Sequence, residues 1–141
     1  PACLAMISKY YGKNYSIQEL REYTSLAKDG VSLLGIEDGA REIGFDTVAV
    51  EISTNDLIEK EPLPCILHWN QNHFVVLKKI TRNIFTKKLF FHLADPSHGL
   101  IKLDEIKFKK SWIVDDNKGV SLFLEPTNDF YKKTPLDCGV F

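Results

Sequence analysis

The sequence predicts an α+β fold in which helices come first and an antiparallel sheet follows. Up to Gly44 the apolar residues recur at helical spacing, as in Leu4, Ile7 and Tyr11. From Phe45 onward, short apolar runs are separated by turn residues, which is typical of strands joined by hairpins. Because helices and strands are segregated rather than alternating, the pattern favours an α+β architecture over a parallel α/β sheet.

Length and composition narrow the class of protein. We expect the 141 residues to form one domain over residues 1–126, followed by a polar and loose tail at 127–141. The net charge of −1 gives no indication of a nucleic-acid or anionic membrane partner. No apolar run approaches the roughly 20 residues of a membrane helix, and no secretory leader is visible. Three cysteines without zinc-type spacing favour reduced thiols and a cytosolic setting.

Three helices are predicted in the first 44 residues. The first covers Pro1–Tyr11, because proline suits a helix start and Gly12 suits its end. The second follows the capping box Ser16–Glu19, and the third lies between the cap Ser32 and Gly44. The predicted inward residues follow the helical repeat: Ile17, Leu20 and Tyr23 in the second helix, and Leu33, Ile36, Ala40 and Ile43 in the third.

Strands dominate the rest of the chain. They are expected at Phe45–Ile52, on both sides of the turn within Cys65–Leu77, and at Leu89–Ala94, Leu100–Leu103 and Val120–Leu124. A short helix is expected from Ser53 through Ile58. A second short helix is expected over Asp104–Trp112, with Ile106 or Phe108 and Trp112 inward.

The central hairpin carries the candidate chemistry. His73 lies where its second strand begins, and Asp95 ends the next strand because Pro96 cannot donate to a ladder. If these strands pair antiparallel, both side chains fall at one end of the sheet. A carboxylate there can hold an imidazole in one tautomer, which is the base-and-orienter half of a nucleophilic triad. The alternatives are a strand-end histidine bound by backbone, and an aspartate that caps its own turn.

The remaining histidines and cysteines have simpler interpretations. His68 and Trp69 are expected to pack within the sheet, and His92 and His98 to lie at the surface or in loops. No histidine pair has metal-ligand spacing, and no cofactor motif is present. Cys3 and Cys65 are expected in the core, and Cys138 is by default an exposed thiol in the tail.

Several segments, taken in order, resemble one known family. They are Ala2–Ile7 with Tyr11-Gly12, Gly30–Ile36, His68-Trp69 with His73–Leu77, Ala94–Pro96 with Gly99, and Trp112 with Leu124–Pro126. The chain is similar in these segments to the bacteriocin-processing cysteine peptidase domain of peptidase-containing ABC transporters. The resemblance implies a papain-like fold, with the active site between a helical half and an antiparallel sheet. It also implies cleavage of a leader peptide after a double-glycine motif, with His73 as base and Asp95 as the residue that orients it.

The family's nucleophile has no counterpart at the matching place in this sequence. In the family an Asp-Cys-Gly segment directly precedes Pro-Ala-Cys, and an upstream glutamine serves the oxyanion hole; both positions would precede Pro1. Asp137-Cys138-Gly139 has the same three residues near the other end of the sequence. Cys138 is therefore a candidate nucleophile if the tail folds back, whereas a rearranged chain or a chance match are the alternatives.

The resemblance also implies partners and a location. The expected partners are a peptide with a double-glycine leader and the transmembrane and ATP-binding domains of a transporter, with no nucleic acid. The leader is expected to bind as a short amphipathic helix on an apolar groove. The location is then the cytoplasmic face of the bacterial plasma membrane. Two alternatives remain: a degenerate domain that binds the transport substrate without cleaving it, and a free-standing cysteine hydrolase of another specificity.

Overall fold

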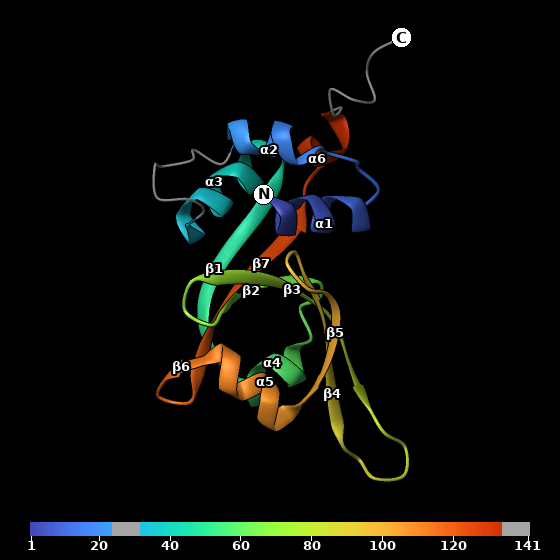
Figure 1. The fold of residues 1–141 in the computed structure, drawn as a ribbon. Helices are drawn as coiled ribbons and strands as arrows, with labels where there is room; N and C mark the ends of the chain where they lie inside the picture. The colour runs from blue at the N-terminus through green and yellow to red at the C-terminus, as the bar shows by residue number, and fades with distance from the viewer. Residues whose placement is uncertain (24–31, 134–141) are drawn as a thin grey trace. The chain divides into compact units, whose positions relative to one another are not determined.

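A computed structural model describes residues 1–23 and 32–133 of the chain (Figure 1). The described residues form two compact units. One comprises those within 1–48 and 124–133, and the other comprises Ala49–Phe123. The boundary between the units falls inside two strands, β1 (Phe45–Ser53) and β7 (Lys118–Pro126). A single domain over residues 1–126 stays a prediction.

The first unit is helical, as the sequence predicts. It contains α1 (Ala2–Tyr10), α2 (Ile17–Tyr23), α3 (Leu33–Glu42) and α6 (Asn128–Lys132). Both predicted caps form, because Ser16 Oγ accepts from the Glu19 amide at 3.0 Å and Ser32 Oγ accepts from the Gly35 amide at 3.1 Å. The buried face includes Leu4, Ile7, Leu20, Ile36, Ala40 and Ile43.

One predicted core position of the first unit is wrong. Ile17 is 46% exposed, whereas Leu20 is fully buried. Ile17 is the first residue of a helix of seven residues. Its side chain therefore lies beyond the packed middle of the helix, and the helical repeat alone does not reveal this.

Helix α6 lies in the segment that the sequence predicts to be loose. Its Phe130 is fully buried, and the Phe130 ring lies 4.6 Å from the Phe45 ring. Thr127 Oγ1 donates to the Gly44 carbonyl at 2.6 Å. Gly44 has a φ of +108°, and a Cβ there would lie 2.2 Å from the Phe130 amide nitrogen, so only glycine fits. Helix α6 is thus packed within the first unit, and residues 134–141 of the predicted tail lie outside the described residues.

The second unit is built on an antiparallel sheet. Its strand order is β1-β7-β2-β3-β4-β5, and β6 (Ile113–Asp115) pairs with β7. The remaining strands are β2 (Cys65–Trp69), β3 (His73–Arg82), β4 (Leu89–Asp95) and β5 (Gly99–Asp104). The β2–β3, β2–β7, β3–β4 and β4–β5 pairs are all antiparallel. The predicted antiparallel sheet with β3 in its interior is confirmed.

Two helices supply the core on this sheet. α5 (Glu105–Trp112) buries Phe108, which stacks on Phe91 at 4.0 Å between ring centroids. Ile106, the alternative inward residue, is 70% exposed because residues two apart lie on opposite sides of a helix. α4 (Thr54–Lys60) adds Leu57 to the same buried cluster. This cluster supports the strands that carry His73 and Asp95.

Candidate active site

His73 and Asp95 lie at the same end of two paired strands. His73 is the first residue of β3 and Asp95 is the last residue of β4, and Val76 pairs with Ala94 between them. The turn before His73 is held from both sides. Trp69 pairs with His73, and the Asn70 amide donates to the Ser111 carbonyl of α5 at 2.9 Å. The position of the imidazole is therefore set by the sheet and by α5.

The two side chains form a short hydrogen bond. His73 Nε2 lies 2.7 Å from Asp95 Oδ1, which confirms the predicted contact. The Asp95 side chain is 4% exposed and the His73 side chain is 32% exposed. The carboxylate is thus shielded from water, whereas the imidazole can be reached from outside.

Two more donors hold the Asp95 carboxylate. The Ser97 amide donates to Oδ1 at 2.8 Å, and His98 Nδ1 lies 3.3 Å from Oδ2. Burial alone would raise the pKa of Asp95. The hydrogen bond from His73, the Ser97 amide, the charge of His73 and the hydrogen bond from His98 outweigh burial and hold that pKa below its usual value.

This environment determines which nitrogen of His73 is free. Since Asp95 is ionised at neutral pH, its oxygens only accept hydrogen bonds, and Nε2 of His73 must carry the proton. In the neutral imidazole, Nδ1 then has a free lone pair. An imidazole in this tautomer can take a proton from a thiol or a water and return it to a leaving group.

His98 belongs to this network, although the sequence indicates only a loop residue. Its side chain is 73% exposed and reaches Asp95 across the Pro96 turn. The available signal was the spacing of three residues between aspartate and histidine in Asp-Pro-Ser-His. The simpler interpretation of Asp95 as a residue that caps its own turn is also correct, because it accepts from the Ser97 amide.

The two cysteines that the structure describes are buried in the core. Cys65 is fully buried in the sheet core, as predicted, and burial raises the pKa of its thiol to about 12. Such a thiol stays protonated and is a poor nucleophile. Cys3 is buried in α1, again as predicted. Cys138 lies outside the described residues.

His68 and His92 do not contact the His73–Asp95 pair, which is called the dyad below. The His68 ring stacks on the Phe74 ring at 5.2 Å, in agreement with the predicted sheet packing. His92 Nε2 lies 2.8 Å from the Thr81 hydroxyl. Burial and the nearby charges of Lys79, Lys102 and Lys78 lower the pKa of His92, so its ring is neutral near pH 7.

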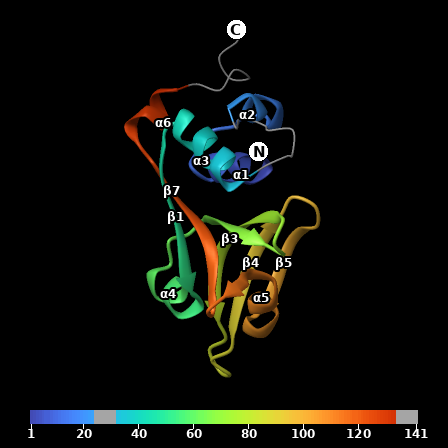
Figure 2. The ribbon, with the colours of Figure 1, turned by 90° about the vertical axis from the view of Figure 1, so that its left-hand side faces the viewer.

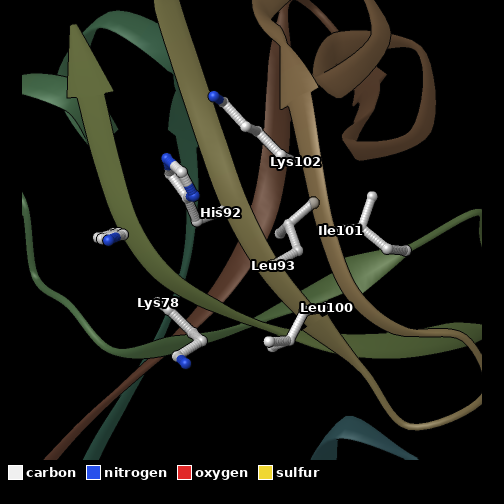
Figure 3. A pocket seen from close by; sticks show the side chains of 7 residues that line it. Lys78, His92, Leu93, Leu100, Ile101 and Lys102 are labelled. Carbon is white, nitrogen blue, oxygen red and sulfur yellow. The ribbon is translucent and has the colours of Figure 1, made fainter.

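An open pocket of about 240 Å³ lies beside His92 (Figure 3). Its lining combines apolar and cationic side chains: Lys78, Lys79, His92, Leu93, Leu100, Ile101 and Lys102. Successive strand residues point to opposite faces, so His92 and Asp95 lie on opposite faces of β4. The pocket is therefore separate from the dyad. Within residues 1–23 and 32–133, no group of three or more potential metal ligands was found.

An imidazole held by a buried carboxylate at the end of an antiparallel sheet is the base-and-orienter arrangement that papain-like peptidases also use. A profile of the Peptidase C39 family matches residues 1–129. The chain belongs to this family. In the part of the chain that the structure describes, no helix is both long enough and apolar enough to cross a bilayer.

Curated relatives are transport proteins with a processing role. The chain is 33% identical over 133 residues to the colicin V secretion/processing ATP-binding protein CvaB of Escherichia coli. The aligned region covers 94% of this chain and 17% of CvaB. It is 35% identical over 134 residues to the lactococcin-G-processing and transport ATP-binding protein LagD of Lactococcus lactis, covering 92% of this chain and 18% of LagD. The chain thus spans under a fifth of the length of these relatives.

Solved structures show the same fold. A double glycine motif protease from an AMS/PCAT transporter, in complex with its leader peptide, matches with a TM-score of 0.77 and 30% identity over 89% of this chain and 82% of that chain. The peptidase domain of Streptococcus ComA, a bi-functional ABC transporter, matches with a TM-score of 0.71 and 30% identity over 89% of this chain and 88% of that chain. These matches confirm the predicted papain-like α+β fold.

Proposed function

We propose that this chain is the peptidase domain of a peptide-exporting ABC transporter and cleaves a leader peptide after a double-glycine motif. The observation that carries the proposal is the 2.7 Å hydrogen bond between His73 and a buried Asp95 in a member of the C39 family. The names of the relatives, which combine processing with transport, support it. So does the similar protease that was solved with its leader peptide.

The proposed reaction follows from the tautomer of His73. A cysteine thiol gives its proton to Nδ1 of His73, and Asp95 stabilises the resulting imidazolium through Nε2. The thiolate attacks the carbonyl carbon of the second glycine, and His73 returns the proton to the leaving amine. A water then gives its proton to His73 and hydrolyses the thioester, which restores the thiol. Cys138 is the candidate nucleophile, since it alone has the Asp-Cys-Gly context in this sequence.

The alternative is a domain that binds the substrate without cleaving it. A binding domain has no need of an imidazole fixed in one tautomer by a buried carboxylate. The processing role in the names of the relatives also favours cleavage. The transmembrane and ATP-binding partner domains, and a place at the cytoplasmic face of the membrane, belong to the same proposal.

A cleavage assay tests the proposal. The full chain is incubated with a synthetic peptide that contains a double-glycine leader, and the products are identified by mass spectrometry. Cleavage after the second glycine is expected, with a loss of about 10²-fold or more in His73→Ala. His92→Gln is the matched control, because His92 lies on the other face of the sheet, and it should cleave normally.

Two further variants test the nucleophile. Loss of cleavage in Cys138→Ala, with normal cleavage in Cys3→Ala, supports Cys138 as the nucleophile. Fluorescence anisotropy with a labelled leader measures binding separately. Leader binding without any cleavage by the unmodified chain would contradict the peptidase proposal and leave the binding function.

A further inference from the structure

The hairpin formed by β3 and β4 ends in an ordered tip with two exposed apolar side chains. The Asn83 side-chain oxygen accepts from the amides of Phe85 at 2.9 Å and Thr86 at 3.0 Å. The Asn83 amide donates to the Lys88 carbonyl at 2.9 Å. These bonds fix the turn, and they leave Ile84 78% exposed and Phe85 92% exposed. Within the second unit, called the sheet unit below, the tip of the hairpin projects past α5 in both views (Figures 1 and 2).

Cationic side chains are concentrated on the hairpin that carries this apolar tip. Residues 78–88 contain no aspartate or glutamate and five cationic side chains, Lys78, Lys79, Arg82, Lys87 and Lys88. Arg82, Lys87 and Lys88 flank the tip itself. Lys79 and Lys102 both pair with His92 and therefore lie farther along the strands. Asp104 Oδ2 lies 3.8 Å from Lys88 Nζ and offsets part of this positive charge. The net charge of −1 for the whole chain therefore hides a local positive surface.

We propose that this hairpin tip is an anchor for an anionic lipid surface. Ile84 and Phe85 enter the boundary between headgroups and acyl chains, and Arg82, Lys87 and Lys88 beside them lie against lipid phosphates. The side chains suit a lipid surface, because flexible cations attract anionic headgroups without fixed geometry and an exposed aromatic ring is favoured at the bilayer interface. This inference goes beyond the proposed peptidase activity and does not depend on it.

The anchor also sets the distance of the dyad from the lipid. His73 begins β3 and Arg82 ends it, nine residues later. At about 3.3 Å per residue, His73 lies about 30 Å along the strand from Arg82, which is two residues before the exposed Ile84. A sheet unit anchored by this tip would keep His73 and Asp95 at the end away from the membrane, where a water-exposed peptide can reach them.

Vesicle binding tests the anchor directly. The full chain is mixed with vesicles of phosphatidylcholine, with or without about 30 mol% phosphatidylglycerol, and binding is measured by flotation. Binding is expected only to the anionic vesicles and should weaken as salt rises from low to physiological concentration. A Phe85→Trp variant reports insertion by a blue shift of its emission, because the native Trp69 and Trp112 are 4% and 0% exposed and respond little.

Three double variants locate the binding surface. Ile84→Ser with Phe85→Ser should abolish flotation. Lys87→Asn with Lys88→Gln should weaken partitioning about 25-fold, since each cation near an anionic surface contributes about fivefold. The matched control is Ile106→Ser with Val114→Ser, which removes two exposed apolar side chains from the same unit and should bind normally.

Three results would overturn the proposal: no binding of the unmodified chain to anionic vesicles, equal binding to neutral and anionic vesicles, or unchanged binding of the two tip variants. Circular dichroism confirms that each variant is folded, which is expected because all the changed side chains are exposed. Vesicle binding by a chain that fails to cleave leader peptides would leave the anchor intact and remove only the peptidase proposal.

Discussion

Truncation of Phe108 should destabilise the sheet unit more than any change on the exposed side of the same helix. Phe108 is fully buried, stacks on Phe91 at 4.0 Å, and lies 5.5 Å and 5.3 Å from the rings of Trp69 and Trp112. Phe108→Ala removes this ring and leaves a cavity that three aromatic neighbours cannot easily fill. The expected loss is about 3–5 kcal/mol of the free energy of unfolding. That is a large part of the roughly 5–15 kcal/mol typical of a whole domain.

Urea denaturation measures this loss. The fluorescence of Trp69 and Trp112 reports the transition, since both rings flank Phe108. With an m-value of about 2 kcal/mol/M, the midpoint should fall by about 2 M. Ile106→Ala is the matched control in α5: Ile106 is 70% exposed, and its replacement should change the free energy of unfolding by less than about 0.5 kcal/mol. Equal midpoints for the two variants would refute the assigned packing of α5.

Three further predictions concern packing and pH. Gly119→Ala places a Cβ 2.3 Å from the Trp112 ring, so it should lower the free energy of unfolding by about 1–3 kcal/mol; an unchanged thermal midpoint would contradict this. The depressed pKa of Asp95 stabilises the fold at neutral pH, and this contribution is lost as the pH falls below 3.8 and through the folded pKa. The Asp95→Asn variant should therefore be less stable than the unmodified chain at pH 7, and its urea midpoint should fall less as the pH is lowered. Equal falls in urea midpoint for the two proteins would be evidence against this. The lowered pKa of His92 means that the unfolded chain binds the proton more readily, so stability falls as the pH drops below 6.5; His92→Gln should remove this part of the slope, which urea titrations between pH 5 and 7 can detect.

Local signals in the sequence explain most of what could be predicted. The caps at Ser16 and Ser32 act within three residues, and both form as expected. Pro96 ends a strand by its own chemistry, so the position of Asp95 follows from two adjacent residues. The position of His73 follows from a hairpin of similarly short range. Because both side chains depended on local rules and one strand pairing, their contact could be predicted without a structure.

Longer-range packing explains what could not be predicted. Helix α6 is ordered because Phe130 packs on Phe45 and because Gly44 leaves room for its backbone. Those partners are more than eighty residues away from Phe130 in the sequence, and no local pattern marks them. The choice between Ile106 and Phe108 likewise depended on which side of α5 meets the sheet. The strand β6 has only three residues, too few for a periodic signal.

The β3–β4 hairpin carries a local positive charge that the net charge of the whole chain does not reveal. A net charge of −1 argued against an anionic membrane partner, yet the cations of residues 78–88 lie on one hairpin without an acid among them. Charge acts over about 8–10 Å at physiological salt, so a local cluster attracts a charged surface whatever the sum over the chain. The same two strands that fix the His73–Asp95 pair at one end carry the exposed tip at the other. Their antiparallel pairing thus determines both the tautomer of the candidate base and the distance of that base from the proposed lipid contact.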